Sequence, residues 1–392
     1  MTPIRDSTAV AEFCAQQRGA AFIAVDTEFM RERTYRPQLC LVQIAGPETA
    51  AAIDPLAEGI DLQPLFDLMA DPATIKVFHA ARQDFEIFFQ MAGQVPQPVA
   101  DTQVMAMVLG FGEAASYETL ANKLAGAHID KTQRFTNWSH RPLSERQIEY
   151  AMSDVIPLRK VYERLHRKLA AAGRTAWVED EMAILTDPKT YQVDPDGAWM
   201  RLRPRTNKPR YLAVLRAVAG WREKEADRRN LPRNRVLRDD TLLDIAAQAP
   251  TTTEALSRAR GLPRGFAESA SGVTLMAAIA EAEALPESEC PQLAARPVGA
   301  NGFGPLVDLL KVLLKMRCET NEVAQKLVAN SADLERIAAD DAAEVPALQG
   351  WRREIFGADA LALKKGTLAL AVVGHRIRTI DLAKQKDGVV RP

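Results

Sequence analysis

The sequence predicts an α/β domain, in which helices flank a mixed sheet, followed by two small all-α domains. Its 392 residues suffice for two or three domains of ordinary size. Short apolar runs typical of strands come early in the chain, and helical periodicity dominates after them. Two stretches rich in proline and glycine interrupt the second half, which indicates boundaries between domains.

The predicted strands are short apolar runs that end at polar or turn residues. The first, Phe22-Ile23-Ala24-Val25, ends at Asp26. Further strands are expected at residues 39–45, 49–53, 75–78 and 99–100. Because short connections join the first three, we expect them to pair as an antiparallel meander. A helix around residues 84–91 is expected after the fourth strand.

A later helix is predicted by its N-terminal cap. Ser144 and Gln147 match a capping box, so the helix should begin there. Tyr150 and Asp154, four residues apart, then share one helical face. Pro157 lacks an N–H, so we expect it to kink the helix or to restart it.

The domain boundaries follow from the two stretches rich in proline and glycine. Residues 187–210 contain four prolines, and residues 285–305 contain four prolines and three glycines. We therefore expect domains at residues 1–195, 205–285 and 300–385. In the last domain five leucines at helical spacing predict one apolar face: Leu306, Leu309, Leu310, Leu313 and Leu314. The two all-α domains have similar lengths but only weak internal similarity, which leaves a repeat open.

The composition excludes several classes of protein. Apolar residues make up 47% of the chain and charged residues 26%, as in a globular protein and not a disordered one. No apolar run reaches the ~18 residues of a membrane span, and the N-terminus lacks the apolar core of a signal peptide. The four cysteines are scattered without a CxxC pair, so no zinc site or disulfide framework is expected. We expect a cytoplasmic protein without a membrane partner.

The charge is distributed unevenly along the chain. The formal net charge is −1, which argues against a generally basic nucleic-acid-binding protein. Residues 201–238, however, hold 13 Lys and Arg against 3 Asp and Glu, a local charge of +10. Such a stretch is suited to phosphate contacts, and the alternative is that its arginines offset acidic surfaces between domains.

The segment Val25-Asp26-Thr27-Glu28-Phe29 carries the strongest chemical signal. Side chains two positions apart on a strand project to the same side, so Asp26 and Glu28 should point together. Two adjacent carboxylates repel unless a cation or a proton lies between them, and a hard divalent ion prefers oxygen ligands. Ordinary surface acids at a strand end are the alternative for this segment alone.

Two further acids extend the pattern. Asp84 opens a helix after an apolar strand, where the helix dipole alone could account for it. Tyr150, one turn before Asp154, could orient a water beside a metal, or could simply form a surface hydrogen bond. Four carboxylates without a His or Cys cluster are typical of a two-metal phosphoryl-transfer site.

The motifs resemble the DEDDy 3′–5′ exonucleases, and most closely the ribonuclease D family. The acids appear in the order Asp26-x-Glu28, Asp84, then Tyr150-x-x-x-Asp154. The intervening segments match as well: Pro37-x-Leu39-x-Leu41-Val42-Gln43, Asp101-Thr102-Gln103, Arg141-Pro142-Leu143 and Tyr150-Ala151-x-x-Asp154-Val155. Further along, the sequence resembles an HRDC domain at Trp221-Arg222, Asn230-x-Pro232 and Val236-Leu237-x-Asp239, and the last domain resembles a second, diverged copy. Asn137, where the family usually has an acid, and Pro157 depart from the pattern.

The resemblance implies a ribonuclease H-like fold and a monomeric 3′–5′ exoribonuclease. Its substrates would be tRNA precursors and other small structured RNAs, and its products nucleoside 5′-monophosphates. Asp26, Glu28 and Asp154 would hold one divalent ion, Mg²⁺ or Mn²⁺, near the attacking water. Asp26 and Asp84 would hold a second ion at the leaving oxygen, while Tyr150 would orient or deprotonate the water, with positioning favoured by its ordinary pKa of about 10. Catalysis is thus expected to involve these five residues.

The candidate RNA contacts have plain structural alternatives. Phe29 could stack on a base or pack in the core. His79 could contact a phosphate or ribose, but its position favours a structural histidine. Lys131 and Arg134 lie before the Tyr150 helix and suit phosphate contacts. The complete set is Thr27, Phe29, His79, Lys131, Arg134, Arg228, Arg229, Arg233 and Arg235.

Two other functions remain open from the sequence. A DNA 3′–5′ exonuclease of proofreading or helicase-associated type would use the same acids, because selectivity for RNA rests on 2′-hydroxyl contacts. A non-catalytic nucleic-acid-binding scaffold is the second alternative. The presence of the expected residue type at all five catalytic positions argues against it.

Overall fold

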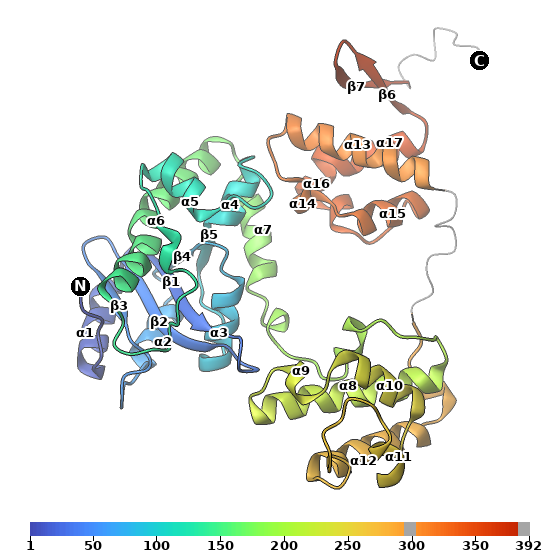
Figure 1. The fold of residues 1–392 in the computed structure, drawn as a ribbon. Helices are drawn as coiled ribbons and strands as arrows, with labels where there is room; N and C mark the ends of the chain where they lie inside the picture. The colour runs from blue at the N-terminus through green and yellow to red at the C-terminus, as the bar shows by residue number, and fades with distance from the viewer. Residues whose placement is uncertain (294–302, 383–392) are drawn as a thin grey trace.

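The computed structural model describes residues 1–293 and 303–382. Its ribbon shows an α/β domain followed by two helical modules (Figure 1). The sheet has the strand order β3-β2-β1-β4-β5, with β1 to β3 antiparallel and β4 and β5 parallel to β1. The mixed sheet and the antiparallel meander are as predicted. The strands are β1 (Phe22–Met30), β2 (Gln38–Ala45), β3 (Ala50–Ile53), β4 (Ile75–Phe78) and β5 (Val99–Asp101).

Helices cover both faces of this sheet. One core combines sheet residues such as Leu41 with Val155 of α6, and the other combines Val42 with Leu65 of α2 and Phe85 of α3. A long helix, α6, packs across β1, β2 and β3. The helices of the domain are α1 (Ser7–Gln17), α2 (Gln63–Ala70), α3 (Arg82–Ala92), α4 (Thr102–Val108), α5 (Tyr117–Leu120), α6 (Glu145–Ala171) and α7 (Thr175–Leu185).

Strand β1 extends further than the sequence predicts. The apolar run predicts an end at Asp26, but the strand pairs with β2 as far as Met30, with one irregularity after Glu28. Polar residues remain in the strand because the antiparallel ladder continues to satisfy the backbone. As a result, Asp26 and Glu28 lie on a paired strand, which fixes their direction.

Helix α6 begins at the predicted capping box, with Ser144 and Gln147 bonded reciprocally. It runs unbroken through Pro157, so the predicted restart is wrong. Pro157 has no N–H for the carbonyl of Ser153, and the Tyr117 hydroxyl donates to that carbonyl instead, at 3.0 Å. A side chain from α5 therefore replaces the helix's missing backbone hydrogen bond.

The first helical module surrounds α8 (Pro209–Arg229), which packs against α10 (Asp239–Gln248) and α12 (Ala270–Ala284). The short helices α9 (Arg233–Val236) and α11 (Thr253–Ser257) complete it. The stretch predicted as a linker before it is not without structure, because it contains 3₁₀ turns at Pro188–Thr190 and Ala198–Arg201.

The second helical module contains α13 (Gly304–Thr320), α14 (Gln325–Val328), α15 (Ser331–Ala339), α16 (Gly350–Arg352) and α17 (Ala358–Lys364). It also carries an antiparallel hairpin of β6 (Leu368–Val373) and β7 (Arg376–Asp381), which the expectation of an all-α domain did not include. Leu309 is 45% exposed and does not belong to the buried face of α13. Residues 300–302 and 383–385 of the predicted domain lie outside the described residues.

The two modules contact the α/β domain through different chemistry. Tyr35 and Arg36, after β1, hydrogen bond to Glu223, Asp227 and Asn230 of the first module. At the second module the rings of Trp177 and Trp351 stack with centroids 4.4 Å apart, and Arg352 pairs with Glu181.

Within residues 1–293 and 303–382 no helix is long and apolar enough to cross a membrane.

Candidate functional site

Three carboxylates meet above the sheet and form what we call the carboxylate cluster. Asp26 and Glu28 project from the same face of β1, and α6 crosses that face to bring in Asp154. One ligand oxygen from each lies within 4.8 Å of the others. Residues far apart in the chain therefore form one oxygen-rich site, the arrangement that the sequence spacing suggested.

Asp84 lies beside the cluster and not within it. It is buried in the first turn of α3 and accepts a hydrogen bond of 2.5 Å from the Thr27 hydroxyl. Thr27 stands between Asp26 and Glu28 on β1, so this bond ties the start of α3 to the acidic strand. The charge of Asp84 also contributes to raising the pKa of both strand carboxylates.

The electrostatics of the carboxylates show a shortage of positive charge. Burial, followed by the charges of Asp154, Asp84 and Glu28, raises the pKa of Asp26 well above its ordinary value. Burial and the neighbouring acids raise the pKa of Glu28 to about 9. Burial likewise raises the pKa of Asp84 and of Asp154 to about 7. Clustered oxygen ligands whose charges repel one another fit a divalent cation, which would supply the missing positive charge.

Tyr150 lies one turn before Asp154 on α6, beside the carboxylate cluster. Its hydroxyl hydrogen bonds to Asp154 one turn later, and its ring packs beside buried Trp138 with centroids 6.1 Å apart. Burial and the negative charge of Asp154 raise the pKa of Tyr150 further above 10. The phenol therefore stays protonated, which favours positioning over general-base catalysis.

Sequence reasoning missed Tyr117, which lines the same cavity as the cluster and contacts α6 next to Asp154. Its bond to the Ser153 carbonyl holds the turn of α6 that presents Asp154. Burial, then the charges of Asp154 and Asp26, raise the pKa of Tyr117, so it remains a donor. The available signal was Pro157, because a proline inside a helix leaves one carbonyl in need of another donor.

All five predicted catalytic residues line a single cavity of about 900 Å³. Five predicted RNA contacts line this main cavity too: Thr27, Phe29, His79, Lys131 and Arg134. His79 faces Thr102 at 3.0 Å through Nδ1, and burial lowers its pKa, so its geometry matches a structural histidine. Lys131 pairs with Glu118 at 2.5 Å.

Phe135 is a second residue that sequence reasoning missed. It lines the main cavity and is 89% exposed, with the Arg134 guanidinium 5.2 Å from the centre of its ring. An aromatic side chain exposed beside a cation is suited to base stacking. The available signal was an aromatic residue next to Arg134 in a polar, basic segment.

The predicted arginine contacts of the first module lie elsewhere. Arg228 and Arg229 pair with Glu225, and Arg233 forms a close pair with Glu223. Among the described residues no ion pair of Arg235 is found. Three arginines of the basic stretch are thus held by acids that its local charge of +10 already includes.

The comparisons with known proteins agree with this geometry. A family model described as 3′–5′ exonuclease matches residues 1–170, and one described as HRDC domain matches residues 211–279. The chain is 54% identical to ribonuclease D of Granulibacter bethesdensis, covering 97% of this chain and 96% of that protein. It is 50% identical to ribonuclease D of Acidiphilium cryptum, with 97% of each covered.

A solved structure matches nearly the whole chain. The crystal structure of Escherichia coli RNase D, described as an exoribonuclease involved in structured RNA processing, has a TM-score of 0.79 and 31% sequence identity. The match covers 93% of this chain and 99% of that one. The catalytic core of RRP6 from Trypanosoma brucei, at 21% identity and a TM-score of 0.53, shares the fold over 72% of this chain.

Proposed function

Because the chain belongs to the ribonuclease D family, we propose that it trims the 3′ extensions of tRNA precursors and other small structured RNAs. The enzyme is a 3′–5′ exoribonuclease. The observation that carries the proposal is the carboxylate cluster, whose three oxygen ligands lie within 4.8 Å of one another. A site of this kind performs phosphoryl transfer, for which the resemblance to ribonuclease D supplies RNA as the substrate.

Two divalent ions, Mg²⁺ or Mn²⁺, fit the donor set. Asp26, Glu28 and Asp154 would hold the ion near the attacking water, and Asp26 and Asp84 the ion near the leaving oxygen. When bound, such ions lower the pKa of a coordinated water and stabilise negative charge on phosphate oxygens. Thr27 keeps Asp84 directed toward the strand by donating to its carboxylate.

The protein's own groups then orient the reaction. The Tyr150 hydroxyl, held by Asp154, positions the water for attack on the last phosphodiester. The P–O bond to the 3′ oxygen breaks, so each cycle releases a nucleoside 5′-monophosphate and leaves a new 3′ hydroxyl. Lys131 and Arg134 lie near the acids and can contact phosphates, while Phe135 can stack on a base. None of these contacts reads a sequence, which suits the trimming of varied 3′ ends.

The test is a tRNA labelled at its 5′ end and carrying a short 3′ extension, incubated with Mg²⁺. We expect a ladder that shortens from the 3′ end and disappears with chelator or in Asp26→Asn. Release of the label from the 5′ end as the first product would contradict the direction. Equal or faster degradation of single-stranded DNA would support the DNA exonuclease instead, and tight binding without cleavage would support a scaffold.

Three other expectations complete the proposal. We expect the chain to act as a monomer, which the mass in solution will test. We expect it to act in the cytoplasm, as its sequence suggests. The second helical module is expected to be a diverged HRDC-like domain.

A further inference from the structure

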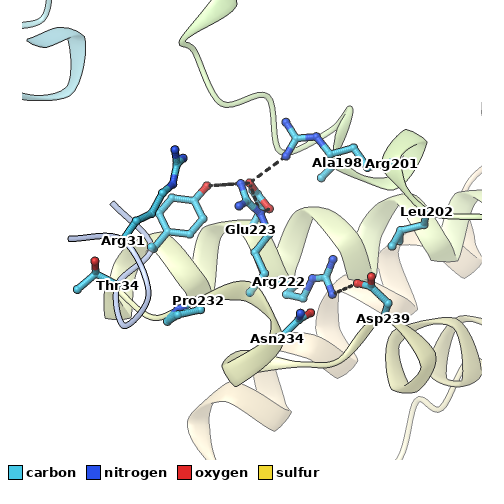
Figure 2. Close-up of a pocket in the computed structure, with 12 residues that line it drawn as sticks. Arg31, Thr34, Ala198, Arg201, Leu202, Arg222, Glu223, Pro232, Asn234 and Asp239 are labelled. Atoms are coloured by element: carbon cyan, nitrogen blue, oxygen red, sulfur yellow. Dashed lines mark hydrogen bonds and ion pairs between the residues drawn. The ribbon is translucent and has the colours of Figure 1, made fainter. Parts of the chain in front are cut away.

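A second cavity lies where the α/β domain meets the first helical module. This interdomain cavity has a volume of about 410 Å³ (Figure 2). Its walls come from the segment after β1, the 3₁₀ turn Ala198–Arg201, α8, α9 and the start of α10. It is separate from the main cavity, but both are lined by Arg31 and Thr34. A polymer leaving the carboxylate cluster over this segment would enter the interdomain cavity.

The walls of this cavity carry an excess of positive charge. Four arginines line it against two acids, an excess of two positive charges. Figure 2 shows Arg31 on one side and Arg201 on the other, with Glu223 between them. The six charged residues are Arg31, Arg201, Arg222, Arg233, Glu223 and Asp239.

Arg222 carries a buried donor without a partner. The residue is 5% exposed, and its Nη1 donates to the Leu237 carbonyl at 2.9 Å and to Asp239 at 2.6 Å. Its Nε, however, has no hydrogen-bond partner among the described residues. A buried N–H left unpaired is costly, so its presence in the wall of a basic cavity points to an anionic ligand.

Two other arginines of the cavity have donors to spare. Arg31 contacts Glu86 through Nη2 at 2.6 Å and is 40% exposed at its side chain. Arg201 approaches Glu223 only to 3.8 Å, without a hydrogen bond, and its side chain is 61% exposed. Arg233 differs, because its guanidinium already donates hydrogen bonds to Glu223 and to the Tyr35 hydroxyl. Arg31 and Arg201 thus line the cavity with N–H groups to spare, and Arg222 adds a buried, unpaired Nε–H in its wall.

We propose that the interdomain cavity binds a backbone phosphate of the RNA strand, upstream of the nucleotide held at the carboxylate cluster. Guanidinium groups bind phosphate oxygens by charge-assisted hydrogen bonds, and a phosphate would satisfy Arg222 Nε. The site makes the first helical module part of the substrate path, independent of base sequence. This inference rests on the proposed exoribonuclease function.

The test compares RNA lengths, using Arg201→Ala as the main variant because Arg201 is exposed and holds no hydrogen bond that the fold needs. On a 5′-labelled RNA of about ten nucleotides we expect KM to rise roughly tenfold, the weight of one charge-assisted hydrogen bond. On a dinucleotide, which reaches only the carboxylate cluster, kinetics should stay as in the wild type. Arg258→Ala, an exposed arginine of the same module outside the cavity, is the matched control.

Two further measurements separate phosphate binding from a structural effect. The slope of log affinity against log salt should become shallower by about 0.7 in Arg201→Ala, the value for one phosphate contact of a single strand. Arg222→Lys, which keeps the charge but removes Nε–H, should lose affinity for long RNA only. A methylphosphonate linkage at the bound position should weaken the wild type but add little in Arg201→Ala.

The outcomes are distinct from those that bear on the enzyme's activity. Equal relative losses on the dinucleotide and on long RNA, or no loss in either arginine variant, would overturn the phosphate site while leaving the exoribonuclease intact. Failure of the wild type to shorten RNA with Mg²⁺ would instead overturn the proposed function itself.

Discussion

Two groups of buried carboxylates in this molecule have opposite electrostatics. In the α/β domain, burial and mutual repulsion raise the pKa values of Asp26, Glu28 and Asp154. In the first helical module, hydrogen bonds from Arg233 and Tyr35 outweigh burial and lower the pKa of Glu223. Acids that serve the fold are thus paired within the chain, whereas those of the carboxylate cluster lack sufficient positive charge. In this molecule, carboxylates without a positively charged partner therefore indicate the functional site more clearly than the number of charged residues does.

The same comparison shows which arginines of the basic stretch are paired within the chain. Residues 201–238 carry a local charge of +10 by count. Glu223 and Glu225 nevertheless engage Arg228, Arg229 and Arg233 at close range. The local charge of +10 already subtracts these two acids, so the pairs do not lower it but show which arginines of the stretch are held within the chain and which keep free donors.

The largest effect is expected from Asp26→Asn, which removes one charge from the unpaired group. Loss of a shared metal ligand should lower kcat by roughly 10³-fold, because metal stabilisation of the transition state is worth several kcal/mol. The metal-free protein should at the same time become more stable, since repulsion within the cluster falls. Single-turnover cleavage and thermal unfolding in chelator will measure the two effects. Retention of wild-type kcat would remove Asp26 from the metal site.

The second prediction concerns the pH dependence of stability, to which the carboxylate cluster and Glu223 should contribute with opposite signs. Because the folded-state pKa of Asp84 and Asp154 is about 7 and that of Glu28 about 9, the folded protein binds more protons than the unfolded chain. The stability of the metal-free protein should therefore fall as pH rises from about 4 towards 9. Glu223, with a lowered pKa, contributes stability that is lost only as pH falls below its ordinary value.

This pH dependence can be checked by the melting temperature in chelator across that range. Addition of Mg²⁺ should restore stability most at the alkaline end, where the carboxylates are ionised. Asp26→Asn is the control and should give a flatter profile. A melting temperature that rises steadily through this range would contradict the shortage of positive charge in the cluster.

The third prediction concerns the pair of Glu223 with Arg233, which Glu223→Gln weakens. Glu223→Gln should lower the free energy of unfolding by about 2 kcal/mol, below the range for a fully buried pair because Arg233 remains 36% exposed. It should also loosen the first module from the α/β domain, since Glu223 accepts a 2.7 Å bond from Tyr35. Denaturant unfolding measures the stability, and Glu225→Gln, whose partner Arg228 is 68% exposed, is a control with a smaller loss. Equal losses would show that burial does not set the strength of these pairs.

The sequence predicts the features of the site that depend on local pattern. The spacing of Asp26 and Glu28, the cap at Ser144 and the helical step from Tyr150 to Asp154 each follow from a short-range rule. The pairing of Glu225 with Arg228 and Arg229 could have been read in the same way, because these residues lie three and four positions apart on α8.

The remaining features depend on contacts between distant segments. The continuation of β1 to Met30 is set by its partner β2, and nothing in its own polar residues indicates it. Glu223 meets Arg233 only because α8 ends at Asn230 in a left-handed conformation, with φ of 47°, and the chain turns back. The meeting of Tyr117 with Ser153 and the interdomain cavity likewise arise from packing.

The fourth prediction separates geometry from charge at the carboxylate cluster. Tyr117→Phe leaves the net charge unchanged but leaves the Ser153 carbonyl without its donor. The unfolding free energy should fall by about 1–3 kcal/mol, the range for an unsatisfied buried group. If this bond positions Asp154, affinity for Mn²⁺ should weaken as well, measured by calorimetry. Loss of stability with unchanged Mn²⁺ affinity would restrict Tyr117 to the fold.

The smallest effects distinguish paired from unpaired arginines on the surface of the first module. Arg228→Ala removes a cation already held by Glu225, whereas Arg235→Ala removes one for which no ion pair is found in the described chain. Stability should change little in both, because exposed ion pairs contribute little. Affinity for RNA should fall only in Arg235→Ala, with a salt slope shallower by about 0.7. A fall as large in Arg228→Ala would mean that RNA displaces Glu225 from its partner, so that pairing within the chain does not remove an arginine from the binding surface.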